Sequence, residues 1–479
     1  SDSAGGHALM LMYTMQGQSR SGKCSTEVNG GRVSLPKLHK DIATLGKQQQ
    51  WQRAMWIFHS LPSQRLRYRV ETYNAAVGAC AKGSQWQRSL QILEMLLCSG
   101  LLPDAISFNS AISACSRSSQ WQLAVQLLGK MQELLVRPDV ISYNTVITAC
   151  EKSHRWQEAL ALLHEAGGQV EQGADVITYN AAISACGKGF QWMRALCLLS
   201  ELLLSCLQPD VITYSSAVNA CEEGGQWQQA LHLLDTMLRS KLQPNAIMYS
   251  AAMSACSKSQ QWDKALFLLG SMLRSTVECD TVSYNAAISA SAKHDLWRLA
   301  LALAAEMPAR SLRRSIVTYS SAITACERSG EWETALALLQ DAAASRLEAS
   351  TISHSAAISA CEKGGRWELA LGLLRAMGSG ALKLDHVSYG AAISACEKCR
   401  RWDLALALFR QMWSRRVPPD IVAYNAVISA TEKGQQWEWT LQLFAELGSR
   451  RLKSDCITVS AVISACEKGH QWSWALRIM

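Results

Sequence analysis

A 35-residue repeat runs through almost the whole chain, and the copy at residues 176–210 shows its design. Apolar residues in its first half recur at i, i+3, i+4 and i+7, the stripe of an amphipathic helix: Tyr179, Ala182, Ile183 and Cys186. Gly187 and Gly189 interrupt this pattern, and a second stripe follows: Trp192, Ala195, Leu196, Leu199 and Leu202. Pro209 closes the copy, because proline cannot continue a helix. Each copy is therefore predicted to be a helical hairpin with one apolar side, stable only when copies stack.

Eleven complete repeats occupy residues 70–455, ahead of a twelfth, incomplete repeat at residues 456–479. They begin at Val70, Ala105, Val140, Val176, Val211, Ala246, Thr281, Ile316, Thr351, His386 and Ile421. All are 35 residues long except the third, which has one extra residue within residues 166–173. Residues 35–69 form a degenerate repeat that is expected to cap the stack. Residues 1–34 are rich in Gly and Ser without periodicity, and are predicted to be disordered.

Stacked hairpins predict an all-α solenoid of about 13 repeats, in place of the roughly three globular domains expected for this length. A solenoid normally ends in a cap with a polar face. The twelfth repeat stops within its second helix and would leave an apolar face open, so we expect a fragment of a longer protein. No apolar run approaches the ~18 residues of a membrane-spanning helix, and no membrane partner is expected.

Ten of the 17 cysteines occupy one position on the apolar stripe of the first helix. Equivalent helices of neighbouring repeats would lie about 8–10 Å apart, whereas a disulfide needs Cα atoms within about 7 Å. These thiols are predicted to be small core residues in a reducing compartment. Cys396 and Cys399 form a lone CxxC without further ligands, so no metal or other cofactor is predicted. The ten are Cys80, Cys115, Cys150, Cys186, Cys221, Cys256, Cys326, Cys361, Cys396 and Cys466.

A tryptophan opens the second helix of every repeat. One hypothesis is a row of stacking platforms for bases; the favoured one is hairpin core, because each Trp lies three and four residues before apolar members of the same stripe. The residues are Trp51, Trp86, Trp121, Trp156, Trp192, Trp227, Trp262, Trp297, Trp332, Trp367, Trp402, Trp437 and Trp472.

The period of 35, the openings VITYN and VISYN, the body ISACEKG and the closing PD resemble the pentatricopeptide repeat family over most of the chain. The tetratricopeptide repeat differs, with a period of 34 and its Trp early in the first helix. The resemblance implies a right-handed superhelix whose first helices line a groove for single-stranded RNA, one base to each repeat. It also implies an organellar protein, in chloroplast or mitochondrion, that acts in RNA processing, stabilisation or translation and recruits a processing enzyme.

In the family, the fifth and last residues of a repeat read the base. Five pairs resemble those for uracil: Asn74/Asp104, Asn109/Asp139, Asn144/Asp175, Asn180/Asp210 and Asn425/Asp455. Ser215/Asn245 resembles an adenine pair, and Ser250/Asp280 and Ser355/Asp385 resemble guanine pairs. Weaker matches are Asn285/Ser315 for cytosine, Ser320/Ser350 for adenine and Gly390/Asp420 for guanine. With the family's parallel orientation, the implied target is 5′-UUUUAGCAGGU-3′.

Side-chain chemistry agrees with these roles, since an Asn amide offers a donor and an acceptor to a pyrimidine and a Ser leaves room for a purine. The alternative is that these residues only cap helices, although variation among Asn, Ser and Gly at one position favours base reading. The second residue is implied to wedge between bases. In the first complete repeat Glu71 takes that place, which weakens recognition by Asn74. The wedge candidates are Ile106, Ile141, Ile177, Ile212, Ile247, Val282, Val317, Ile352, Val387, Val422 and Ile457.

Position 13 of the repeat carries a cation in all but one copy, although the net charge of +8 is modest. Such a stripe predicts contact with a phosphate backbone. The alternative, which can coexist, is that Lys and Arg near a helix end complement its dipole. Only Glu223 breaks the series. The cations are Lys82, Arg117, Lys152, Lys188, Lys258, Lys293, Arg328, Lys363, Lys398, Lys433 and Lys468.

The favoured function is therefore sequence-specific binding of single-stranded RNA. A protein-interaction scaffold of the tetratricopeptide kind is the alternative, but its groove would vary in apolar and charged residues and would not repeat Asn, Ser and Asp. Catalysis is not expected. None of the ten histidines is followed two residues later by Glu, as a deaminase requires, and no phosphate-binding loop or nucleophile arrangement is present.

Overall fold

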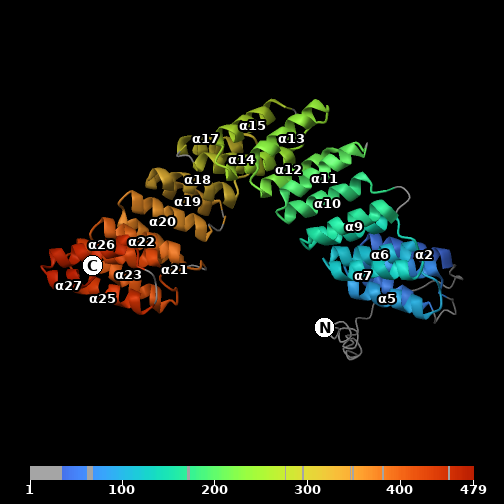
Figure 1. Cartoon of the computed structure of the whole chain (residues 1–479), viewed down its shortest axis with the longest axis horizontal. Coiled ribbons are helices and arrows are strands. Elements are labelled where there is room, and N and C mark those ends of the chain that lie inside the picture. The colour runs from blue at the N-terminus through green and yellow to red at the C-terminus, as the bar shows by residue number, and fades with distance from the viewer. Residues whose placement is uncertain are drawn as a thin grey trace. The chain divides into compact units, whose positions relative to one another are not determined.

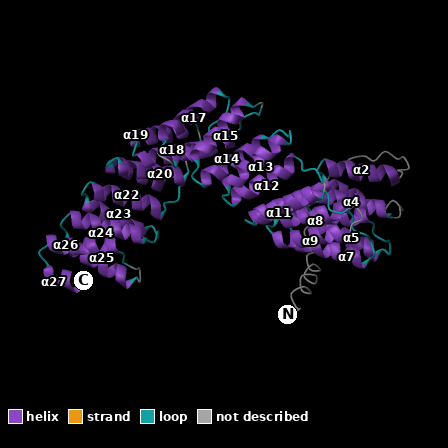
Figure 2. Ribbon diagram, turned by 45° about the horizontal axis from the view of Figure 1, so that its top comes forward, coloured by secondary structure: helices purple, strands orange, loops and turns teal. Residues whose placement is uncertain are grey.

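The computed structural model describes residues 35–61, 68–169, 173–205, 207–275, 277–293, 296–345, 347, 350–379, 382–450 and 454–478. Within these ranges all the helices are α-helices and no strand occurs (Figure 2). The predicted all-α class is confirmed. The segment predicted to be disordered, residues 1–34, lies outside the described residues, as do residues 170–172 of the segment 166–173 that is predicted to hold the extra residue of the third repeat.

The helices alternate as first and second members of hairpins. The first helices are α2 (Leu35–Lys47), α4 (Val70–Lys82), α6 (Ala105–Arg117), α8 (Val140–Lys152), α10 (Val176–Lys188), α12 (Val211–Glu223), α14 (Ala246–Lys258), α16 (Thr281–Ala292), α18 (Ile316–Ser329), α20 (Thr351–Lys363), α22 (His386–Lys398), α24 (Ile421–Lys433) and α26 (Cys456–Lys468). The second helices are α3 (Trp51–Ser60), α5 (Trp86–Cys98), α7 (Trp121–Glu133), α9 (Trp156–Gln169), α11 (Trp192–Leu204), α13 (Trp227–Arg239), α15 (Trp262–Arg274), α17 (Trp297–Ala309), α19 (Trp332–Ala344), α21 (Trp367–Ser379), α23 (Trp402–Ser414), α25 (Trp437–Ser449) and α27 (Trp472–Ile478).

The chain divides into two compact parts, residues 1–114 and residues 115–479, with the boundary inside α6. In the N-terminal part, α2 packs beside α4, and α3 contacts both. In the C-terminal part, the first helices from α8 to α26 pack side by side in chain order, as α18, α20 and α22 show (Figure 1). Second helices contact the first helix of their own hairpin and that of the next. Repetition of one hairpin contact in this way is the α-solenoid that the period predicts.

The core of the hairpin at residues 176–210 follows the predicted stripes with two differences. Ala182, Ile183 and Cys186 are buried as expected. Gly187, however, does not end the first helix; it lies inside α10, which continues to Lys188. A Cβ on Gly187 would lie 3.1 Å from the Cα of Ala220, so the missing side chain allows α10 and α12 to approach closely. In α11, Leu198 is buried where Leu196 was expected, because the stripe is turned slightly around the helix.

The recurring tryptophans lie at the junctions between hairpins. Most are half-buried, so the core interpretation holds with the refinement that the ring packs on the following repeat. A Cβ on Gly364, at the end of α20, would lie 2.3 Å from Cδ1 of Trp332. Glycine at position 14 therefore makes room for the ring. Arginines cover several of these rings, for example Arg366 at 4.8 Å from the centroid of Trp332, a cation–π contact that uses the outer face of the indole.

The ten repeat cysteines are all buried and free, as predicted. Burial raises the pKa of Cys115, Cys221 and Cys361 to about 11. These thiols therefore stay protonated and act as small apolar side chains. No helix among the described residues is long and apolar enough to cross a membrane.

Candidate nucleic-acid interface

The predicted wedge, reader and cation share one side of the first helix. At 100° per residue, positions 9 and 13 lie about 20° to either side of position 2, and position 5 lies about 60° from position 2. In α10 these positions hold Ile177, Ser184, Lys188 and Asn180. Because first helices stack side by side, the same four positions recur from helix to helix. We call the side chains at positions 2 and 5, with the last residue of each repeat, the recognition row.

The wedge candidates of the recognition row are exposed without exception. Their side chains are 51–66% exposed although all are β-branched and apolar. Single apolar residues on a surface are common, but here Ile or Val projects from the same point of eleven successive first helices, α6 to α26. Glu71 is also exposed at this position of α4. The arrangement leaves each aliphatic side chain able to contact a flat ligand group.

The reader amides are hydrogen-bonded to the last residue of their own repeat. In the N-terminal part, Nδ2 of Asn74 donates to both carboxylate oxygens of Asp104, at 3.0 and 3.1 Å. The same bond recurs in the C-terminal part from Asn144 to Asp175 at 3.1 Å, from Asn180 to Asp210 at 3.2 Å, from Asn425 to Asp455 at 2.9 Å and from Asn285 to Ser315 at 3.3 Å. These residue pairs, predicted to read one base together, are therefore adjacent.

The last residues also cap the following first helix. Asp175, for example, accepts the backbone N–H of Thr178 at 2.8 Å. Equivalent caps come from Asp104, Asp139, Asp210, Asn245, Asp280, Ser315, Ser350, Asp385, Asp420 and Asp455. The capping role weighed as the alternative is thus real, and it uses one oxygen of a group that has further acceptor sites. Base reading by these residues stays a prediction.

Hydrogen bonding keeps several of these carboxylates ionised. Burial raises the pKa of Asp175, but hydrogen bonds from Thr178 and Asn144 outweigh burial and hold the pKa below its ordinary value. The pKa of Asp104 is lowered in the same way, with burial opposed by hydrogen bonds from Ser107 and Asn74. A carboxylate that remains charged acts only as an acceptor, which orients the amide beside it.

Serine readers are arranged differently. The hydroxyls of Ser250, Ser320 and Ser355 donate to carbonyls of their own helix at 2.8–3.0 Å, so lone pairs are what they can offer a ligand. Ser215 is buried, and its oxygen has no hydrogen-bond partner among the described residues. At Gly390 an added Cβ would meet nothing within 4 Å, so this repeat presents open space at position 5.

The position-13 cations are engaged by the preceding repeat. Position-12 glutamates bind them in the ion pairs Lys188–Glu151 at 2.9 Å, Lys398–Glu362 at 2.9 Å, Lys433–Glu397 at 2.8 Å and Lys468–Glu432. Lys258 lies between Glu222 and Glu223, at 3.5 and 3.6 Å. Others donate to backbone carbonyls, as Lys293 does to Ser257 at 2.7 Å, which supports the helix-end interpretation. We call these lysine–glutamate pairs the charge ladder; sequence reasoning missed it, although Glu recurs in ISACEKG. Contact of the cations with phosphate stays a prediction.

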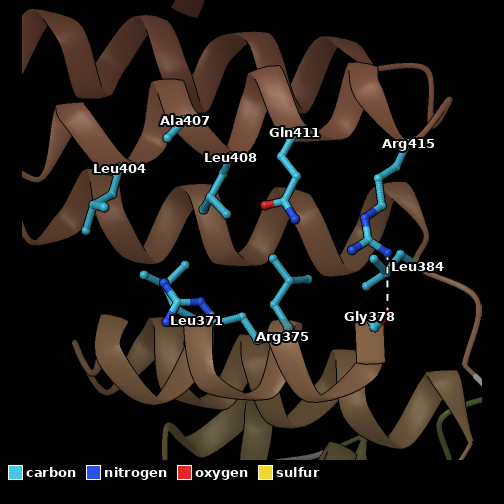
Figure 3. Close-up of a pocket in the computed structure, with 10 residues that line it drawn as sticks. Leu371, Arg375, Gly378, Leu384, Leu404, Ala407, Leu408, Gln411 and Arg415 are labelled. Carbon is cyan, nitrogen blue, oxygen red and sulfur yellow. Dashed lines mark hydrogen bonds between the residues drawn. The ribbon is translucent and has the colours of Figure 1, made fainter. Parts of the chain in front are cut away.

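A cavity of about 430 Å³ lies between the second helices α21 and α23 (Figure 3). Leu371, Leu404 and Leu408 line it with the side chains of Arg375 and Arg415, and Arg415 donates to the carbonyl of Gly378 at 3.5 Å. No member of the recognition row lines this cavity. Among the described residues, no group of three or more His, Cys, Asp or Glu side chains could hold a metal ion.

Comparison with known proteins identifies the repeat. Models of the PPR repeat family match residues 103–152 and 384–433, and the pentatricopeptide repeat domain matches residues 198–259. The single PPR repeat matches residues 141–166, 177–206, 247–277, 282–312, 317–343 and 352–379. No curated protein sequence matches the chain.

Among solved structures, the pentatricopeptide repeat protein PPR10 from maize is similar, with a TM-score of 0.57 and 19% identity over 94% of this chain and 78% of that chain. PPR10 in complex with an 18-nucleotide psaJ RNA element gives a TM-score of 0.48 and 21% identity over 94% and 69%. Yeast Rmd9p in complex with a 16-nucleotide target RNA gives 0.31 and 12% over 84% and 82%. The first likeness supports the α-solenoid fold.

Proposed function

This chain belongs to the pentatricopeptide repeat family, and from that premise we propose that it binds single-stranded RNA along the recognition row, one base to each repeat. The observation that carries the proposal is the recurrence, in register, of an exposed Ile or Val three residues before a polar reader. In four such repeats the reader is an Asn hydrogen-bonded to the last residue of its repeat. Such a unit pairs an apolar contact for a base face with polar groups for its edge, which is how proteins read unstacked bases.

The two kinds of reader support different bases. In Asn144, one Nδ2–H is used by Asp175 and the other is left for a ligand acceptor. In Ser355 the hydroxyl proton is used by the carbonyl of Ile352, so the oxygen can accept from a ligand donor. Uracil presents carbonyl oxygens, whereas guanine presents N–H groups. This chemistry agrees with the target 5′-UUUUAGCAGGU-3′, in which the first U, the C, the second A and the third G are the weakest assignments.

PPR10, which shares the fold, has been crystallised with an RNA element, and this supports RNA as the ligand class here. We propose that the protein acts on organellar transcripts by binding without catalysis, which shields the RNA or brings a processing enzyme to it. Import of a fluorescent fusion of the full-length protein into isolated chloroplasts or mitochondria tests the location. A fusion that neither organelle imports contradicts it.

Fluorescence anisotropy with labelled 5′-UUUUAGCAGGU-3′ and a permuted RNA of equal composition tests the function. Because a mismatched base costs about 1–3 kcal/mol in specific nucleic-acid complexes, the permuted RNA is expected to bind at least tenfold more weakly. Exchanging single nucleotides then assigns each repeat to one base. Equal affinity for both RNAs would exclude sequence-specific reading, and no measurable binding of either would exclude the proposed function.

A further inference from the structure

A hydroxyl of the next repeat reaches the reader amide. Thr178, at position 3 of its repeat, lies 2.5 Å from Oδ1 of Asn144 and 2.6 Å from Oδ1 of Asp175 through its own Oγ1. The same hydroxyl-to-amide contact recurs in both parts of the chain: Ser107 to Asn74 at 2.5 Å, Thr318 to Asn285 at 2.6 Å and Thr458 to Asn425 at 2.5 Å. A bond repeated at four separate readers is a feature of the repeat and not of one site.

We propose that this hydroxyl is a positioning residue that turns the donor end of the Asn readers it contacts toward the base, and so sets their preference for uracil over cytosine. The inference rests on the proposed function, because it concerns how the same row reads RNA. It assigns a role to position 3, a residue outside the reader pair, and it places that residue in the repeat after the one whose base it affects.

The amide orientation follows from its partners. An Asn side chain carries two N–H donors at one end of its amide and a carbonyl acceptor at the other. Because the two ends have nearly the same shape, the hydrogen-bond partners decide which end points where. The ionised Asp175 can only accept, so it requires the nitrogen of Asn144 on its side. The hydroxyl of Thr178 has one proton, shared between Oδ1 of Asp175 and Oδ1 of Asn144, and this donor favours the carbonyl end of the Asn144 amide on its side. One Nδ2–H then remains for the ligand, while one of the two lone pairs of the carbonyl oxygen is already taken, so the amide offers the base mainly a donor.

An amide that presents its donor end to the base distinguishes the two pyrimidines. On the Watson–Crick edge uracil has a carbonyl oxygen, O4, where cytosine has an amino group, N4. The free Nδ2–H can donate to O4, whereas against the amino group two donors would face each other and a desolvated polar group would be left unpaired. If the hydroxyl were absent, the Asn carbonyl could accept from the cytosine amino group. Discrimination between the bases would then weaken.

The sequence supports the same role independently. Every Asn reader is followed by a hydroxyl at position 3 of the next repeat: Ser107, Ser142, Thr178, Thr213, Thr318 and Thr458. The two complete repeats without a hydroxyl there have Met248 and Ala423, and they follow the readers Ser215 and Gly390, which have no amide to orient. One Asn departs from the pattern: Thr213 donates to Asp210 at 2.8 Å, and the buried Oδ1 of Asn180 has no partner among the described residues.

The test compares Thr178→Ala with Thr178→Ser, which differ only in the hydroxyl. Affinity is measured for the target RNA and for the same RNA with C at the third nucleotide, the one assigned to Asn144. Thr178→Ser should retain the wild-type ratio of U to C affinities, and Thr178→Ala should lower it roughly threefold to tenfold, the worth of one hydrogen bond.

Ser388→Ala is the matched control. Oγ of Ser388 lies 2.5 Å from Oδ1 of Asp385, as Oγ1 of Thr178 lies 2.6 Å from Oδ1 of Asp175, but the preceding reader is Ser355, which has no amide. Its removal weakens the same kind of helix cap, and it should leave the base preference at the ninth nucleotide, assigned to Ser355, unchanged. A structural role alone would lower the affinity of Thr178→Ala for both RNAs alike and leave their ratio intact; that result overturns the inference. A wild-type protein that binds all the RNAs equally overturns the proposed function, and the inference with it.

Discussion

The charge ladder makes the salt dependence of RNA binding predictable. In four rungs a position-12 glutamate that is 13–18% exposed neutralises a lysine that is 38–45% exposed. The perturbation is the combined change Glu151→Gln, Glu362→Gln, Glu397→Gln and Glu432→Gln. Gln keeps the size of the side chain and an oxygen that can accept, as Glu151 does, the hydroxyl of Ser184. It removes the charge that competes with phosphate.

The expected magnitude follows from counterion release. Each cation that neutralises a phosphate of single-stranded nucleic acid contributes about 0.7 to the slope of log affinity against log salt. Four released lysines should therefore steepen the slope by up to about 3. Between 50 and 200 mM salt, the variant should lose up to roughly fiftyfold more affinity than the wild type does. Each partly exposed ion pair contributes about 0.2–1 kcal/mol, so the four changes together should lower stability by roughly 1–4 kcal/mol.

The assay is fluorescence anisotropy with the target RNA at five or six salt concentrations. A variant with the same change in net charge is the control, with glutamates of second helices replaced: Glu94→Gln, Glu201→Gln, Glu333→Gln and Glu368→Gln. The control should raise affinity slightly at low salt and keep the wild-type slope. Parallel lines for the ladder variant and the wild type would refute the reasoning, because they would mean that the position-13 cations do not contact phosphate.

Three further predictions concern the fold. Gly364→Ala should lower stability by about 1 kcal/mol, because its Cβ would meet Trp332. Gly372→Ala should raise stability by roughly 0.5–1 kcal/mol, because Gly372 lies inside α21 and an added Cβ there would meet nothing within 4 Å. Equal denaturation midpoints for the two variants and the wild type would contradict both expectations. Thiol labelling at pH 8, followed by mass spectrometry, should modify the exposed Cys98, Cys197 and Cys456. It should spare the ten buried repeat cysteines, because burial raises their pKa values. Uniform labelling of all these cysteines would show that the repeats open freely. The lowered pKa of Asp175 contributes stability that is present above the unfolded pKa of about 3.9 and is lost as pH falls through the folded pKa. Asp175→Asn, which can still cap the helix, should therefore reduce the acid-induced loss of stability measured by circular dichroism. An acid-unfolding profile identical to that of the wild type would contradict this expectation.

The hairpins could be predicted from the sequence because their signals lie within one helix. Val176 and Trp192 begin α10 and α11 as the stripes indicate, and ten cysteines at one position predict a buried column. The reader pairs are implied by the family resemblance, and their adjacency agrees with the stacking of repeats, since Asn144 is the fifth and Asp175 the last residue of one repeat. The spacing of apolar residues predicts which side of one helix is buried. That information is sufficient to predict the helices and their pairing into hairpins.

Contacts between repeats could not be derived in this way. The bond from Thr178 to Asn144 and the ion pair of Lys188 with Glu151 join residues 34 and 37 positions apart, and they depend on the offset between neighbouring first helices. That offset is set by packing, including the close approach at Gly187. The same limit applies to the tryptophans. Periodicity predicts that each Trp faces the apolar side of its helix, but the half-burial of its ring against the next repeat depends on where that repeat lies.

The split of each proposed reading assembly across a repeat boundary matters for protein engineering. Asn144 lies in α8, Asp175 precedes α10 and Thr178 lies within α10, whereas Tyr143 binds Glu165 inside a single hairpin at 3.1 Å. A transplant cut at Val140 and Asp175 would leave the Thr178 hydroxyl behind. A cassette cut at residues 143–178 would carry amide, carboxylate and hydroxyl together, so the exchangeable module of this protein is offset by three residues from its repeat.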